Sequence, residues 1–131
     1  LRRIVGPMPH DRRGIVRILL ESLIARLAAQ IVDIERISGR TRSIIHVVGG
    51  ASRIHFLMQW LSDATGKEVI AGPVEATSLG NAAVQWCVLG EFSNIDEARS
   101  SIARMAEIRS FTPETDRDYW REYAGRLGWD I

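Results

Sequence analysis

Cysteine is nearly absent from this sequence, which excludes a fold held together by internal disulfides. Cys87 is the single cysteine among 131 residues, and one thiol cannot form an internal bridge. An excess of charge of one sign is also lacking, since 17 Lys and Arg residues face 16 Asp and Glu residues, for a formal net charge of +1. Without a basic excess the chain lacks the broad positive surface of proteins that bind nucleic acid or anionic membranes. We therefore expect neither partner.

Long apolar runs are missing as well. None approaches the roughly 18 residues that a membrane-spanning helix needs, and the amino terminus shows no secretory pattern. We therefore expect a cytoplasmic protein. The hydrophobic fraction of 46% is typical of a packed globular domain, and the length suits one domain or one piece of a larger one.

The first third of the chain has helical periodicity. Residues 11–37 carry apolar side chains at steps of three and four, which predicts one long helix ended by Ser38-Gly39. The predicted core-facing stripe consists of Val16, Leu20, Leu23, Leu27, Ile31 and Ile34. The apolar residues that lie outside this stripe are Ile15, Ile18, Leu19 and Ile24. Because they widen it beyond one face, we expect the helix to be covered on two sides.

A short run rich in β-branched residues comes next. Residues 44–48 predict a strand buried on both faces, terminated by Gly49-Gly50. The apolar pattern after this turn predicts a helix that Gly66 caps. One βα unit is thereby complete.

A second βα unit repeats the pattern. Residues 67–71 predict a strand and residues 76–89 a helix. Two strands are too few for a stable sheet, since sheets commonly have about four to six. We expect the remaining strands to come from a missing part of the protein or from a partner.

Helices are predicted for the rest of the chain. Ser93 and Asp96 resemble a capping box and open one helix. Thr112-Pro113 suits the start of a last helix, which ends at Gly128 and carries aromatic residues that dock the tail onto the body. The fold class is therefore α/β with helix in excess, and no repeat or linker marks an internal boundary.

The strand, two glycines and helix around Gly49-Gly50 form the most informative segment. Glycine lets a ligand approach the main chain, and the free N–H groups of a following helix favour an anion. The segment is thus a candidate nucleotide-binding edge. A simple tight turn remains the other interpretation.

Particular residues extend this pattern. Residues 47–52, reading VVGGAS, with Gln59 and Ser62-Asp63 resemble the carboxyl-terminal signature of the FGGY carbohydrate kinases. In that signature a Gly-Gly-Gly/Ala turn precedes a helix that bears Gln and Ala/Ser-Asp. Residues 69–81, reading VIAGPVEATSLGN, are similar to the rhamnulokinase version of the next segment.

The resemblance implies an actin-like ATPase (ribonuclease H-like) fold of two domains with the active site between them. Residues 1–131 would be the carboxyl-terminal half of the second domain. The implied reaction is transfer of phosphate from ATP, with Mg2+, to a ketose, with L-rhamnulose as the substrate of this branch. The implied partners are thus ATP or ADP and the sugar.

The same resemblance implies the site residues. In such kinases the glycine turn lies against the nucleotide, so Gly49, Gly50 and Ala51 would make backbone contacts, with Ser52 close by. The family commonly has asparagine where this chain has Ile54. Because Ile54 is apolar, it cannot make the polar contact to the adenine that the resemblance implies for this asparagine.

No catalytic or metal-binding residue is predicted. Asp63 and Glu75 lie near predicted helix ends, where carboxylates are ordinary, and in the family the catalytic aspartate lies upstream. His10, His46 and His55 lack the spacing of a zinc site.

Alternatives to a rhamnulose kinase remain open at the level of sequence. One is an FGGY kinase for another sugar such as fuculose, xylulose or glycerol. Another is a degenerate, non-catalytic module that serves association or regulation. We also expect the isolated chain to form a dimer or another small oligomer, because missing sheet partners would leave apolar surface exposed.

Overall fold

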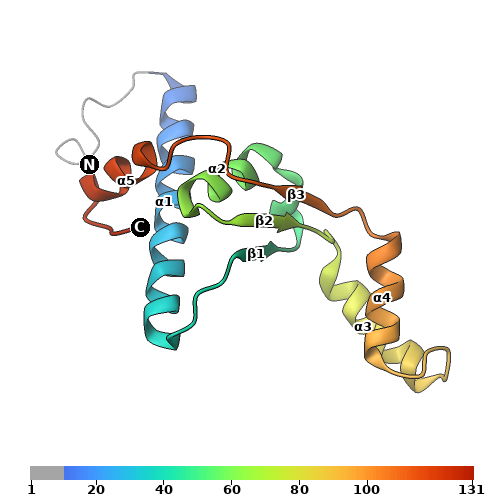
Figure 1. The fold of residues 1–131 in the computed structure, drawn as a ribbon. Coiled ribbons are helices and arrows are strands. Elements are labelled where there is room, and N and C mark those ends of the chain that lie inside the picture. Colours follow the sequence, from blue (N-terminus) through green and yellow to red (C-terminus); the bar gives the residue numbers. More distant parts are fainter. Residues whose placement is uncertain (1–10) are drawn as a thin grey trace.

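The computed structural model describes residues 11–131 and shows a helix-rich α/β arrangement around a small sheet (Figure 1). The helices are α1 (Arg12–Ser38), α2 (His55–Thr65), α3 (Ala76–Val88), α4 (Ile95–Met105) and α5 (Asp118–Arg126), with a short 3-10 helix η1 (Gly50–Arg53). The strands are β1 (Ile44–Val47), β2 (Glu68–Ala71) and β3 (Arg109–Phe111). Within the described range, no helix has both the length and the apolar character to cross a membrane. The predicted α/β class is confirmed.

The sheet has the order β1-β2-β3, with β2 in the centre. β1 and β2 run parallel, with Ile45 opposite Val69, as two consecutive βα units require. β2 and β3 run antiparallel, with Val69 opposite Phe111. β3 was not predicted, because three residues are too few to show a periodic pattern and the strand forms by pairing with β2.

β1 is not buried on both faces, and that prediction was wrong. Ile45 and Val47 pack against the core, whereas Ile44, His46 and Val48 are exposed. The reason is positional: β1 is the edge strand of this sheet, and within residues 11–131 its outer face has no covering element. The alternation of buried and exposed residues is typical of a strand with one solvated face.

The core-facing side of α1 also differs from the predicted stripe. The buried residues of this helix are Glu21, Ile24, Ala25, Ala28 and Ala29. Leu20 and Ile31 of the predicted stripe pack at the margin of the core. The other four residues of the stripe are exposed, namely Val16, Leu23, Leu27 and Ile34. Alanines face inward because their small side chains let α2 approach closely. Both α2 and α5 pack on α1, as its wide apolar surface predicted, while a further apolar side of this helix is uncovered among the described residues.

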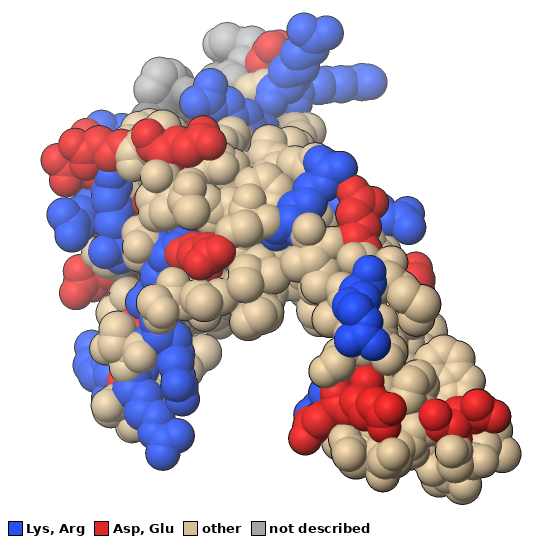
Figure 2. All heavy atoms as spheres, turned by 45° about the vertical axis from the view of Figure 1, so that its right-hand side comes forward, with Lys and Arg blue, Asp and Glu red and all other residues tan. Residues whose placement is uncertain are grey.

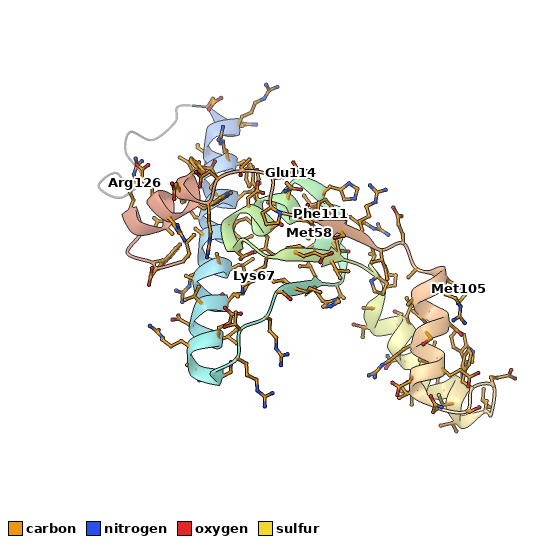
Figure 3. All side chains as sticks on the ribbon, in the orientation of Figure 1. Met58, Lys67, Met105, Phe111, Glu114 and Arg126 are labelled. Atoms are coloured by element: carbon orange, nitrogen blue, oxygen red, sulfur yellow. The ribbon has the colours of Figure 1, made fainter. Side chains whose placement is uncertain are left out.

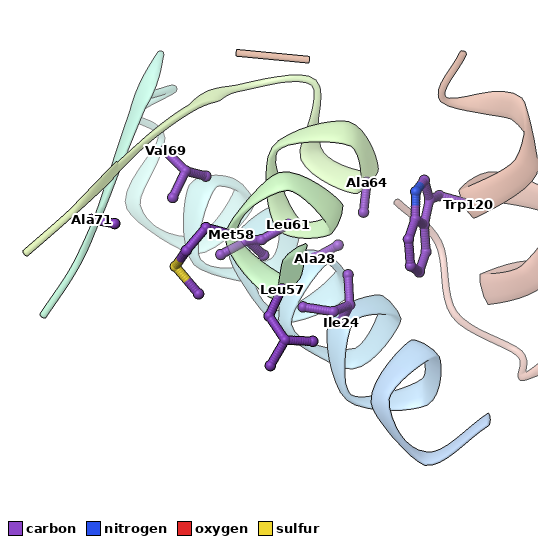
Figure 4. Close-up of a cluster of buried hydrophobic side chains, with 9 residues drawn as sticks. All are labelled: Ile24, Ala28, Leu57, Met58, Leu61, Ala64, Val69, Ala71 and Trp120. Carbon is purple, nitrogen blue, oxygen red and sulfur yellow. The ribbon is translucent and has the colours of Figure 1, made fainter. Parts of the chain in front are cut away.

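The core lies between α1, α2 and β2, with Trp120 of α5 closing one end (Figure 4). Its members are Ile24, Ala28, Leu57, Met58, Leu61, Ala64, Val69, Ala71 and Trp120. Fully burying a side chain of the size of Ile24 contributes about 1.5–3 kcal/mol. Trp120 meets Trp60 edge-to-face at 5.8 Å between ring centroids. The predicted docking of the aromatic tail is therefore confirmed.

α3 and α4 form a hairpin that extends away from the rest of the chain (Figure 1). The predicted capping box at Ser93 and Asp96 is displaced by one residue. Asn94 is the N-cap of α4, and its Oδ1 accepts the N–H groups of Asp96 at 3.1 Å and Glu97 at 3.0 Å. The Glu97 carboxylate in turn accepts the Ser93 N–H at 2.9 Å. Asparagine and serine are both strong N-cap residues, so the sequence alone did not distinguish Asn94 from Ser93.

The last helix begins at Asp118, so the predicted start at Thr112-Pro113 was wrong. The chain after β3 instead crosses α2 in an extended path, which Figure 3 shows at Glu114. The Thr112 carbonyl accepts from Gln59 Nε2 at 2.7 Å, and the Glu114 N–H donates to Asp63 at 2.9 Å. These tertiary hydrogen bonds take the place of the first helical turn.

Candidate functional site

The glycine turn after β1 has a conformation that depends on Gly49. Its backbone angles are φ 82° and ψ −170°, a region that residues with a side chain rarely adopt. The Gly49 N–H donates to the Pro73 carbonyl at 3.2 Å, and the Ser52 N–H and hydroxyl donate to the Gly49 carbonyl at 3.1 and 2.7 Å. The Gly72 N–H donates to the Val47 carbonyl at 2.8 Å. The ends of the two parallel strands are thereby tied together.

The turn leads directly into η1, which leaves main-chain donors unused. The first N–H groups of a helix have no partner within it, and within residues 11–131 those of Gly50 and Ala51 donate to no other protein group. A Cβ built on Gly50 would have no atom within 4 Å. The turn therefore offers two N–H donors on a surface free of side-chain crowding.

A cavity of about 400 Å3 adjoins this turn. It is lined by Ser52, Arg53, His55, Ala71, Val74, Glu107 and Arg109. Ser52 follows β1 and Ala71 ends β2, so the cavity lies at the carboxyl ends of the parallel strands, where open α/β sheets commonly bind ligands. Of the four predicted site residues, Ser52 lines the cavity, while Gly49, Gly50 and Ala51 form the adjoining turn.

The wall that β3 contributes to this cavity was not predicted from the sequence. Arg109 donates from Nε and Nη2 to Glu107 Oε1 at 3.0 and 2.7 Å, and its Nη1 lies 3.4 Å from His55 Nδ1. The main chain at Glu107 approaches Gly72 so closely that a Cβ there would lie 2.5 Å from the Glu107 carbonyl oxygen. No local signal predicts this proximity, because 37 positions separate Gly72 from Arg109.

The polar residues of α2 hold β3 and the following segment in place. The Ser62 hydroxyl lies 2.7 Å from the Lys67 carbonyl and 3.1 Å from the Phe111 carbonyl. Gln59 Nε2 donates to Asp63 Oδ1 at 3.0 Å as well as to the chain after β3. Asp63 is buried and its Oδ1 is engaged by these donors. Gln59, Ser62 and Asp63 thus position the cavity wall.

The remaining candidate residues do not assemble into a reactive group. Glu75 occupies the N-cap position of α3 without a side-chain capping bond, and Cys87 is half-buried farther along the same helix. His46 projects from β1, apart from the cavity, and His10 lies outside the described residues. Across residues 11–131, no three His, Cys, Asp or Glu side chains are arranged to hold a metal ion.

Comparison with known protein families supplies the context for this site. The model of the FGGY family of carbohydrate kinases, C-terminal domain, matches residues 4–88. The match includes the glycine turn, the polar residues of α2 and helix α3, and it ends before α4, β3 and α5. Because it spans more than half of the 131 residues, the chain belongs to the FGGY family of carbohydrate kinases.

Proposed function

We propose that this chain supplies part of the nucleotide-binding surface of an ATP-dependent sugar kinase with an actin-like fold. Residues 1–131 would form one unit of its second domain. The observation that carries the proposal is the Gly49–Ser52 turn, in which Gly50 and Ala51 have unused N–H groups and Ser52 lines a cavity at the carboxyl ends of β1 and β2. Main-chain N–H groups at such a position suit a phosphate or the polar edge of a nucleotide.

Phosphoryl transfer needs more than this surface provides. A base must accept the proton of the sugar hydroxyl, and a metal ion must bridge phosphate oxygens. The carboxylates of residues 11–131 do not form a metal-binding group, so they do not fit the Mg2+ that the reaction uses. In the proposed enzyme the base and the metal ligands come from residues outside this chain, which by itself is inactive.

We further propose L-rhamnulose as the substrate, with L-rhamnulose 1-phosphate as the product, in a cytoplasmic enzyme of rhamnose catabolism. The proposal rests on the segment VIAGPVEATSLGN at residues 69–81, which includes β2 and the start of α3. A phosphorylation assay of the full-length protein with L-rhamnulose, fuculose, xylulose and glycerol tests it. Preference for any of the other three would contradict the assignment.

Titration calorimetry of the chain with Mg-ATP and Mg-ADP tests the nucleotide surface. We expect binding that a Gly50→Val variant weakens by about tenfold or more, because the new side chain would occupy the space beside the free N–H groups. Gly125→Val is the matched control, since a Cβ at either glycine meets no atom within 4 Å and neither has a positive φ.

The outcomes separate the alternatives. Binding that Gly50→Val leaves unchanged would place the nucleotide elsewhere. Absence of binding by the parent chain would favour a non-catalytic module, the second candidate function. Ile54 favours that candidate, because an apolar side chain that is 40% exposed stands where FGGY kinases commonly carry an asparagine near the adenine.

A further inference from the structure

The cavity beside the glycine turn has basic lining residues, one of which lies outside the family match. Arg53 ends η1 and His55 begins α2, both within the matched residues. A third, Arg109, comes from β3, which lies beyond the matched residues 4–88. Arg109 therefore reaches the cavity only because β3 pairs with β2.

The guanidinium of Arg109 is oriented by its neighbours. Glu107 engages Nε and Nη2, which leaves Nη1 as the nitrogen that no carboxylate in the described range contacts. This Nη1 lies 3.4 Å from His55 Nδ1, a long contact that competes weakly for its protons. A rigid, planar cation with free N–H groups is well suited to bind phosphate oxygens.

The charge of the cavity wall favours an anion. Glu107 is the sole carboxylate among its seven lining residues, and its Oε1 is already paired with Arg109. Arg53 adds a second permanent positive charge, and the ion pairs of the described residues do not include it. The residues that face the cavity therefore carry more positive than negative charge.

Several contacts hold the backbone beneath Arg109. Glu107 packs on Gly72, which has no side chain to keep it away, and the end of β3 is held by the Ser62 hydroxyl. His55 contacts Phe111 with 5.9 Å between ring centroids. These contacts fix the position of β3, from which Arg109 lines the cavity.

We propose that Arg109, together with Arg53 and His55, binds a phosphate group of the nucleotide. The inference rests on the proposed function, because it places the phosphate of the same ligand against the basic residues of the cavity that Ser52 of the turn also lines. It makes β3 part of the binding site.

Calorimetric titrations of the parent chain and of Arg109→Gln test the proposal, with Mg-ADP, adenosine and inorganic pyrophosphate as probes. We expect Arg109→Gln to weaken Mg-ADP and pyrophosphate binding by about tenfold or more, as loss of a hydrogen bond to a charged group does. Adenosine binding should not change. Arg126→Gln is the matched control, because Arg126 also pairs with a nearby glutamate, Glu122, on the surface of α5.

Three results would overturn the proposal, and they are distinguishable. Equal Mg-ADP affinity of Arg109→Gln and the parent would refute the role of Arg109 and leave the nucleotide surface intact. An equal loss of adenosine and Mg-ADP binding would assign Arg109 to the nucleoside. A parent chain that binds neither Mg-ADP nor pyrophosphate would refute the nucleotide surface and this inference together. Urea unfolding of both variants identifies any loss that arises from misfolding.

Discussion

Ile54 stands between the glycine turn and α2, where its side chain satisfies no polar group. It is the N-cap residue of α2 and makes no side-chain capping bond. The first N–H groups of a helix need acceptors, and Asn is among the best residues at this position. The isoleucine side chain is also 40% exposed. Ile54 therefore leaves the start of α2 without a side-chain cap and adds no polar group beside the proposed site.

Replacing Ile54 by asparagine should stabilise the protein. We expect Ile54→Asn to raise the free energy of unfolding by about 0.5–2 kcal/mol, because the amide oxygen can accept an N–H of the first turn of α2. Urea unfolding followed by circular dichroism measures the change. Ile34→Asn serves as the control, since Ile34 is exposed in the interior of α1 and should gain nothing. Equal or lower stability of Ile54→Asn would contradict the capping argument.

At the scale of elements, Glu35 connects the end of α1 to the sheet. Its Oε1 accepts the Arg42 N–H at 2.6 Å and the Lys67 ammonium at 3.0 Å, and Lys67 also donates to the Arg42 carbonyl at 2.6 Å. Figure 3 shows Lys67 close to α1. The Arg42 N–H above all, and then Lys67, lower the pKa of the Glu35 carboxyl from its ordinary 4.5. The ionised carboxylate thus fixes the loop that precedes β1.

The pH dependence of stability should report this contact. A lowered pKa in the folded state contributes stability that is fully present above the unfolded pKa of about 4.5 and is lost as the pH falls through the folded value. We expect Glu35→Gln to be less stable than the parent at pH 7, with a difference that shrinks as the pH falls below 4.5. Urea unfolding at a series of pH values measures it. A difference that does not depend on pH would refute the ionic contribution.

In the described part of the molecule, two segments project on either side of a hollow (Figure 2). One is the carboxyl-terminal end of α1, on which Lys and Arg side chains gather, and the other is the α3–α4 hairpin, with acidic side chains near its tip. Several large apolar side chains of α1 are exposed, among them Leu19 at 63% and Ile37 at 84%. Exposed apolar surface of this kind marks a site of association. We propose that the isolated chain buries it by self-association.

Sedimentation velocity at micromolar concentration tests this proposal. We expect a dimer or another small oligomer that Leu19→Gln and Leu23→Gln shift toward monomer, because a polar amide reduces the apolar area available to a second copy. Val88→Gln, on the exposed surface of α3, is the control. It tests whether the association surface lies on the α3–α4 hairpin instead of α1. A parent chain that is strictly monomeric would contradict self-association.

The helices follow from local patterns in the sequence, whereas their contacts do not. Gly39 and Gly66 adopt the left-handed conformation at the ends of α1 and α2, as the positions of these glycines predicted. The inward face of α1 was predicted wrongly, because apolar residues lie on more than one face of this helix. The tertiary structure places Ile24 and the small Ala28 in the core, where they pack with residues of α2.

The candidate site also has one part that the sequence predicts and one that it does not. The glycine turn was predictable, because Gly49-Gly50 directly after a run of β-branched residues marks the end of a strand. The Arg109 wall was not, because a three-residue strand has no pattern of its own and exists through pairing with β2. By itself the sequence determined most of the helices, the two parallel strands and the turn, since these depend on neighbouring residues, whereas tertiary hydrogen bonds decide where α5 begins. Only the tertiary structure decided which side of α1 is buried and which side chains face the turn, because both depend on contacts between residues far apart in the chain.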